Sequence, residues 1–315
     1  MMPEIKRLPR NLRAGGTQLS RVFHAGVPPF PDGIRQVNDQ CAEISCYANF
    51  TQSGAAGFVG SMFVVAVAGM LFALGIMGAE HMTYRVAGDM LISVLIAVAI
   101  ALLFYFGSGA HRSKGGFIRI HRGTRKLYFI YPRQKRLHIL DWDQLEALAG
   151  YIPIVSASGY ASRHPLYLIG VDYTMDPPTE ICAACGNLGL FDGDRSAKAL
   201  WSYLQVFMER GPDGLPKPPP MPQRQSRWQE TLQPYHDWYT GLRGRLTRRY
   251  GLLKAPITIP LWLGWLLINA FPESVEAFLQ YNVPYTQFPK EIDRLCGFEV
   301  KRKPVIRVDG ERIDP

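Results

Sequence analysis

The chain has one cysteine pair with the spacing of a redox or metal site, Cys182 and Cys185 in the stretch CAAC. A zinc site needs two further ligands, and the sequence holds no second CxxC or HxxxH pair. A thioredoxin-like site begins a helix in a βαβ unit, whereas the surrounding TEICAACG is typical of a strand. We therefore interpret both cysteines as structural and expect no metal and no cofactor.

Two motifs that contain aspartate are weaker candidates for a metal site or a catalytic dyad. The carboxylates of Asp141 and Asp143 in DWD could hold a metal ion, but a strand-to-helix junction capped by Asp143 is the plainer interpretation. His236 and Asp237 are adjacent in YHDWY, and adjacent residues of a helix do not face each other as a dyad would. The nucleophile-elbow, zinc-protease and Walker A motifs are absent from the sequence. These observations argue against an enzyme.

Composition points to a membrane surface. The 315 residues carry a formal net charge of +9, and the basic residues cluster beside apolar runs. Such clusters favour anionic lipid, with nucleic acid or an acidic protein as the alternatives. Five scattered cysteines do not make a secreted disulfide framework, which indicates free thiols in a reducing compartment. Residues 1–35 are basic, but no apolar core follows at the distance of a signal peptide.

Residues 55–110 are predicted to form a transmembrane helical hairpin. The runs 55–79 and 90–110 are uncharged, and a bilayer core of about 30 Å needs about 20 helical residues. Six Lys or Arg residues precede the hairpin, and nine lie between His111 and Arg136 without an acid. The positive-inside rule then predicts that both ends are cytoplasmic. The hairpin runs hold no acid or base, which makes a transporter an unattractive interpretation.

Residues 1–54 are expected to be a cytoplasmic N-terminal region, and residues 111–211 a compact α+β domain. Apolar and basic residues alternate in GFIRIHRG as in a half-buried strand, and KLYFIYP, KRLHILDWD, LYLIGVDY and TEICAACG are further strand candidates. The stretch DRSAKALWSYLQVFMERG predicts a helix that Asp194 caps and Gly211 ends. A β-meander closed by one helix indicates a pleckstrin-homology-like fold, an analogy of pattern that gives no function.

A proline-rich linker and an amphipathic helix are expected next. Residues 212–227 lie in a stretch with six prolines, which predicts an extended spacer. Ser226 and Gln229 fit a capping box, and aromatic and leucine residues then recur at three- and four-residue steps up to a basic end. Such a helix suits a membrane surface, and packing against the cytoplasmic domain is an equal alternative.

The helix and a third apolar run make up region 228–272. The run 255–272 has 18 uncharged residues, at the short limit for a crossing, and contains Pro256 and Pro260. The charge step from five preceding basic residues to Glu273 permits a crossing. Length and prolines favour an interfacial or re-entrant segment, which we expect, followed by a C-terminal tail over residues 273–315.

Several stretches together resemble a family of uncharacterised proteobacterial membrane proteins that are often encoded beside type VI secretion effectors. The stretches are IRQVND, FIRIHRGTRKLYFIY, ILDWD, ALWSYLQVFM, YHDWY and FPKEIDRLCG, spread from Ile34 to Gly297. The family's more usual residue at the His121 position is Asn. The resemblance implies a role beside polymorphic toxins, as an immunity protein or as a loading adaptor. It supplies no catalytic or binding residues.

We therefore expect a protein of the bacterial inner membrane with most of its chain in the cytoplasm. Its expected function is that of an immunity protein that binds and neutralises a cognate type VI secretion toxin. The alternatives are an effector adaptor or chaperone, and an enzyme acting on lipid or nucleic acid. The expected partners are the toxin or effector and anionic inner-membrane lipids, with no nucleic acid.

The surfaces expected to bind a partner are a basic strand face and the aromatic helix. Exposed arginine and aromatic side chains are the usual energetic anchors of an interface. The same basic face could instead rest on anionic lipid, at about 1 kcal/mol per charge. The candidate residues are Arg119, Arg122, Arg125 and Lys126 on the strand face, and Trp228, Tyr235, Trp238 and Tyr239 on the helix.

Overall fold

The structure is a computed structural model that describes residues 4–21, 27–77, 84–131, 134–156, 159–186, 193–220, 225–298, 305–306 and 312–313. The chain folds as an α+β protein in two compact units. One unit combines Met1–Tyr47, Phe117–Met221 and Gln287–Pro315, and the other combines Ala48–Gly116 and Pro222–Thr286. Each unit is thus assembled from distant parts of the sequence, whereas the sequence predicted six successive regions.

The first unit contains a five-stranded antiparallel meander in which neighbours in sequence are neighbours in the sheet. Its strands are β2 (Ile34–Val37), β3 (Cys41–Ser45), β4 (Phe117–His121), β5 (Lys126–Ile130) and β6 (Leu137–Asp141). The apolar hairpin is inserted between β3 and β4, which still pair directly, with Glu43 opposite Arg119. The predicted N-terminal region 1–54 therefore contributes β2 and β3 to this sheet.

A second antiparallel sheet has the strand order β1-β7-β10-β11. Its strands are β1 (Thr17–Leu19), β7 (Glu146–Ala149), β10 (Leu166–Asp172) and β11 (Thr179–Cys185), and β8 (Ile152–Ser156) and β9 (Gly159–Arg163) form a separate hairpin. Two short strands, β12 (Val305–Ile306) and β13 (Arg312–Ile313), pair near the C-terminus. A 3-10 helix, η1, covers Arg10–Arg13.

Helix α3 (Arg195–Arg210) follows the second sheet, as predicted, and buries Leu200, Leu204 and Phe207. It ends at Gly211, whose φ of +90° is the left-handed region that glycine adopts without strain. The expected side-chain cap from Asp194 is not made. The Asp194 carboxylate instead pairs with Lys198 at 2.7 Å.

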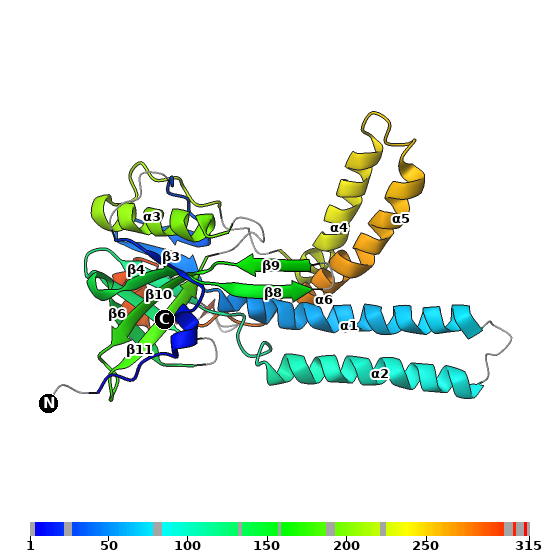
Figure 1. Ribbon diagram of the computed structural model, residues 1–315, viewed down its shortest axis with the longest axis horizontal. Coiled ribbons are helices and arrows are strands. Elements are labelled where there is room, and N and C mark those ends of the chain that lie inside the picture. The colour runs from blue at the N-terminus through cyan, green and yellow to red at the C-terminus, as the bar shows by residue number, and fades with distance from the viewer. Residues whose placement is uncertain are drawn as a thin grey trace. The chain divides into compact units, whose positions relative to one another are not determined.

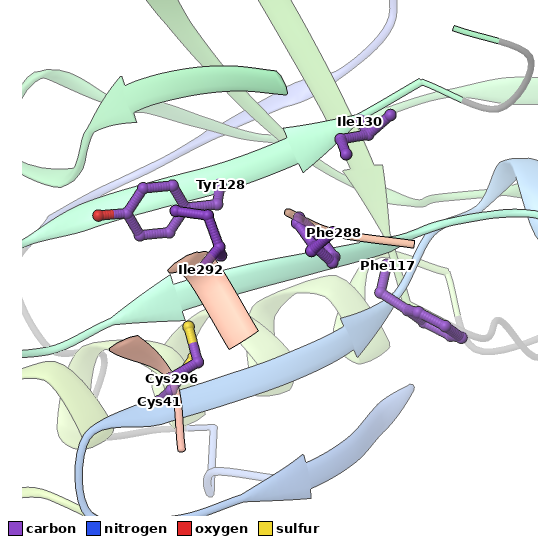
Figure 2. Packing of buried hydrophobic residues seen from close by; sticks show 7 residues of the cluster. All are labelled: Cys41, Phe117, Tyr128, Ile130, Phe288, Ile292 and Cys296. Carbon is purple, nitrogen blue, oxygen red and sulfur yellow. The ribbon is translucent and has the colours of Figure 1, made fainter. Parts of the chain in front are cut away.

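All five predicted strand stretches are strands, but β4 is buried along its whole length and not on one face only. The reason is helix α7 (Lys290–Leu295), which lies over this part of the five-stranded sheet (Figure 2). Phe288 and Ile292 pack there against Phe117 and Tyr128. The predicted tail beyond residue 273 therefore contributes directly to the core of the first unit.

The second unit is helical. It contains α1 (Ala48–Met77), α2 (Tyr84–Gly107) and α4 (Arg227–Leu246). It also contains α5 (Ala255–Trp265), a π-helical stretch η4 (Leu266–Ala270) and α6 (Phe271–Gln280). Helices α1 and α2 run side by side (Figure 1), and the rings of Phe58 and Phe104 lie 5.4 Å apart. Residues 78–83, which join the two helices, lie outside the described residues.

Within the described residues, three helices are long and apolar enough to cross a membrane, which indicates that the chain is a membrane protein. They are Ser53–Gly75, Tyr84–Gly107 and Ala255–Gln280. The two hairpin helices were predicted. The third is longer than expected, because α5, η4 and α6 form one helix of 26 residues that passes through Pro260 and Pro272. Its last part carries Glu273 and Glu276, which the sequence analysis placed in the tail.

Candidate interaction surfaces

Arg119 lies at the centre of a buried polar cluster in the first unit. Its Nε donates to Glu43 Oε2 at 2.8 Å and its Nη1 to Asp293 Oδ1 at 2.5 Å. The side chains of Arg119 and Glu43 are only 8% and 4% exposed, and the guanidinium stacks 4.2 Å from the ring centre of Phe288. Burial opposes the charge of Arg119, but the hydrogen bonds that it donates to Asp293 and Glu43 outweigh the effect of burial and raise its pKa. The prediction that Arg119 is exposed for a partner is wrong.

The other three basic candidates lie at or beside the β4–β5 turn. Arg122 donates from Nη2 to the carbonyl of Glu209 at 3.4 Å. Arg125 forms a two-point ion pair with Asp143, at 2.7 Å from Nε and 2.5 Å from Nη2. Lys126, like Arg122 and Arg125, is not buried. The exposed basic surface is therefore this turn and not the face of β4.

A small pocket of about 100 Å³ opens beside this turn. Trp142 and Trp201 form its apolar part, with ring centres 5.2 Å apart. The guanidinium of Arg21 donates to the carbonyls of Trp142 and Asp143 at its edge. Its remaining lining residues are Arg125, Asp143, Gln205 and Glu209. Both signs of charge line it, so it is not a dedicated anion or cation site.

The aspartates of DWD have structural roles. Asp141 caps the 3-10 helix η3 (Trp142–Gln144) by accepting from the Asp143 amide at 3.0 Å. The predicted cap was Asp143. That residue instead binds Arg125, and the hydrogen bond from Arg125 lowers its pKa. Capping by Asp141 follows the usual geometry of an acidic residue before a helix.

The CAAC cysteines lie in β11, as the sequence indicated. Cys185 is buried and Cys182 half-buried, and burial raises the pKa of Cys182 to about 12. A thiol with so high a pKa is a poor nucleophile and a poor metal ligand at neutral pH. Within the described parts of the chain, no three His, Cys, Asp or Glu side chains come together as a metal site.

One buried acid–base pair was missed. His138 Nδ1 lies 2.9 Å from Asp172 Oδ2, and both side chains are almost fully buried. Asp172 Oδ1 also accepts from the amide and hydroxyl of Thr174, at 3.0 and 2.6 Å. Burial raises the pKa of Asp172, but the hydrogen bonds from Thr174 and His138 prevail and lower it. The partners are 34 positions apart in the sequence and lie on β6 and β10, so no local motif indicated the pair.

The aromatic helix α4 is divided between two environments. Ser226 and Gln229 form the predicted capping box. Trp228 and Tyr239 are 67% and 57% exposed, whereas Tyr235 and Trp238 are half-buried. Trp238 faces α5 and donates from its indole to the carbonyl of Trp262. The predicted single aromatic face is therefore only partly available to a partner.

The fold defines a membrane protein whose antiparallel sheet is interrupted by a membrane hairpin. The model of a family of unknown function, DUF6708, matches residues 93–298, and the chain belongs to that family. The matched range begins within α2 and runs through strands β4 to β11 to the segment that carries α7, and it leaves out β1, β2 and β3. No curated protein and no solved structure matches the chain.

Proposed function

We propose that the chain is an immunity protein anchored in the bacterial inner membrane, which binds and neutralises a cognate type VI secretion toxin on the cytoplasmic side. The proposal assigns it a binding role without catalysis. The observation that carries the anchoring is the insertion of α1 and α2 between the paired strands β3 and β4. Because these strands are hydrogen-bonded neighbours, the two ends of the hairpin start from one side of the bilayer.

The charge of the flanking segments supports a cytoplasmic first unit. Six Lys or Arg residues precede the hairpin, and nine follow it between His111 and Arg136 without an acid. Positively charged flanks favour the cytoplasmic side of a bacterial inner membrane. The association with type VI toxins rests on the resemblance described for the sequence.

The partner surface that we propose on the first unit is the β4–β5 turn with the adjoining tryptophan pocket. It combines the half-buried Arg122 and the exposed Lys126 with a small pocket that the buried rings of Trp142 and Trp201 line. Arginine is one of the usual energetic anchors of an interface. On the second unit, Trp228 and Tyr239 are the remaining exposed aromatic candidates.

The test pairs the full chain with an effector toxin from the same gene neighbourhood. We expect the chain to restore growth of cells that make the toxin and to co-purify with it in detergent. Arg122→Glu with Lys126→Glu should weaken capture, whereas Arg10→Glu with Lys217→Glu makes the same charge change at other exposed positions and should not. A full chain that neither protects nor captures the toxin would overturn the proposal.

An adaptor that holds an effector at the membrane before secretion is the alternative. The hydrogen-bonded strands β3 and β4, which join the first unit to the hairpin, would serve an adaptor equally well. The two roles differ in what deletion of the gene does. Loss of an adaptor stops export of the effector, whereas loss of an immunity protein leaves export intact and makes the cell sensitive to toxin.

We further propose that the first unit has a pleckstrin-homology-like fold. Two antiparallel sheets followed by the single helix α3 support this assignment. An experimental structure should then show the two sheets packed face to face, with α3 closing one end. Sheets that do not pack on each other would exclude that fold.

A further inference from the structure

Helix α4 and the long helix α5–α6 form an antiparallel pair along the whole length of α4 (Figure 1). At one end, Arg227 donates to the carbonyl of Phe278 at 3.3 Å and its guanidinium stacks 3.9 Å from that ring. In the middle of α4, the indoles of Trp238 and Trp262 donate to each other's carbonyls, at 2.6 and 2.8 Å. Near the other end, the guanidinium of Arg245 stacks 4.5 Å from the ring centre of Trp262. These contacts make the two helices one rigid hairpin, so both must occupy the same environment.

That environment is not the bilayer core, because α4 carries charges on the side away from its partner. The side chains of His236 and Asp237 in the middle of α4 are 72% and 68% exposed, and Arg243, about two turns further on, is exposed as well. Charged side chains at bilayer depth are strongly unfavourable unless they are paired inside a bundle or line water. The apolar length of α5–α6 would allow this helix to cross the membrane, but the charged helix α4 that packs against it makes a crossing unfavourable.

The exposed surface of α5 and η4 is apolar. Ile257, Leu261 and Ile268 are 70%, 69% and 69% exposed, and Trp265 is 53% exposed. A hairpin with one apolar helix and one polar helix suits the bilayer surface, with the apolar helix among the upper acyl chains and the polar helix in the headgroup region.

The contacts with α1 agree with a position near one membrane face. Phe271 stacks 5.6 Å from Phe63, and Pro272 lies so close to Gly60 that an added Cβ would be 2.7 Å from the proline Cα. Both α1 residues belong to the first half of the candidate span Ser53–Gly75. The part of the long helix that touches α1 is thus attached within this first half, between the start of the span and its middle.

The tip of the hairpin combines exposed apolar residues with positive charge. Tyr250, Leu252 and Leu253, between α4 and α5, are 62%, 78% and 80% exposed. No acidic residue occurs between Asp237 and Glu273. The basic residues in that interval are Arg243, Arg245, Arg248, Arg249 and Lys254.

We propose that the α4–α5 hairpin lies on the membrane surface and that its tip, residues 248–254, binds an anionic phospholipid bilayer. Leu252 and Leu253 enter the headgroup boundary, while Arg248, Arg249 and Lys254 contact lipid phosphates. Apolar insertion combined with local positive charge is the signature of an interfacial anchor on anionic lipid. An acidic protein or a nucleic acid would match the charge but leave the leucines without a partner.

The experiment uses the full chain in nanodiscs with an environment-sensitive fluorophore on Leu253→Cys. The background is low because four native cysteines are buried and Cys182 is half-buried. We expect the probe to enter an apolar environment when phosphatidylglycerol is present, and less so in phosphatidylcholine alone. High salt should reverse the difference, because it screens exposed charges.

Two variants make the result decisive. Replacing Arg248, Arg249 and Lys254 with Gln should lower the insertion equilibrium on anionic lipid about a hundredfold, at the usual contribution of each basic residue near such a surface. A probe on Thr240→Cys, on the exposed side of α4, should stay in water in both lipids.

Three outcomes would overturn the proposal. A Leu253 probe that stays in water in both lipids would exclude insertion of the tip. A Thr240 probe as lipid-protected as the Leu253 probe would show that the hairpin crosses the bilayer. A Leu253 response that needs duplex DNA or an acidic polypeptide, and not anionic lipid, would assign the tip to that class of partner.

Discussion

Glu43 of β3 and Arg119 of β4 form a buried ion pair, with Nε 2.8 Å from Oε2, across the point where the membrane hairpin is inserted into the sheet. The two residues are direct partners in the strand register, although 75 residues separate them in the sequence. The pair joins the two strands from which the hairpin starts and returns. Asp293 extends it to the segment that packs over the sheet.

Arg119→Met should destabilise the first unit by about 3–5 kcal/mol, because it leaves Glu43 as a buried charge without its main partner. The matched control is Lys126→Met, an exposed position where a change within about 0.5 kcal/mol is expected. Denaturant unfolding of the full chain in detergent, followed by tryptophan fluorescence, measures both. A further Glu43→Gln change should recover part of the loss, and an Arg119→Met protein as stable as the parent would contradict the role of the pair.

Stability should fall as the pH drops below about 6.5 because of His121. Burial lowers the pKa of His121 below its ordinary value of 6.5. Its Nδ1 also accepts from the Thr124 amide at 3.0 Å, which requires that nitrogen to be unprotonated. The unfolded chain then binds the proton more readily than the folded one. The contribution is fully present above pH 6.5 and is lost as the pH falls toward the folded-state pKa.

The measurement is the free energy of unfolding in detergent between neutral and mildly acidic pH. His121→Asn removes the titrating group and should flatten this part of the profile. An unchanged slope in the variant would assign the pH dependence to other groups.

Local sequence patterns predicted most of the helices and five of the strands in the two larger sheets. Charge-free runs of 20 or more residues predict membrane helices because only a helix satisfies its backbone in lipid. The capping box of α4 and the apolar stripe of α3 are also local signals, and both were confirmed. Strands β4, β5, β6, β10 and β11 could be recognised because each lies between turn residues.

Long-range contacts were beyond that reasoning. The alternation in GFIRIHRG correctly predicts a strand. It also predicts one solvent-exposed face for that strand, which in the structure is covered by Phe288, Ile292 and Asp293. The residues around Arg119 in the sequence do not indicate that Asp293, 174 positions later, packs on it. The burial of Arg119, the pairing of β3 with β4 and the His138–Asp172 pair were missed for this same reason.

Gly60→Ala should separate α6 from α1. An added Cβ would lie 2.7 Å from the Pro272 Cα, too close for a real side chain, and overpacking of this kind costs about 1–3 kcal/mol. Gly69 in the same helix has nothing within 4 Å of its added Cβ, so Gly69→Ala is the matched control and should be neutral or stabilising.

The readout is oxidative cross-linking of Phe63→Cys with Phe271→Cys, at positions where the parent rings lie 5.6 Å apart. We expect the cross-link to form efficiently beside Gly69→Ala and poorly beside Gly60→Ala. Equal cross-linking in the two backgrounds would show that close approach at Gly60 does not hold the helices together.

The topology of the hairpin can be tested with one thiol on each expected side. Tyr84 at the start of α2 is 99% exposed, and Lys126 is an exposed residue of β5. Because β3 and β4 are paired neighbours, we expect both ends of the hairpin to start from one side of the bilayer and Tyr84 to lie on the other. An impermeant maleimide added to intact spheroplasts should label Tyr84→Cys, and should label Lys126→Cys only after permeabilisation. Since the native thiols of Cys41 and Cys185 are buried and Cys182 is half-buried, Cys182→Ser is the one background change required. Labelling of Lys126→Cys in intact spheroplasts would place the first unit outside and remove the basis for a cytoplasmic partner.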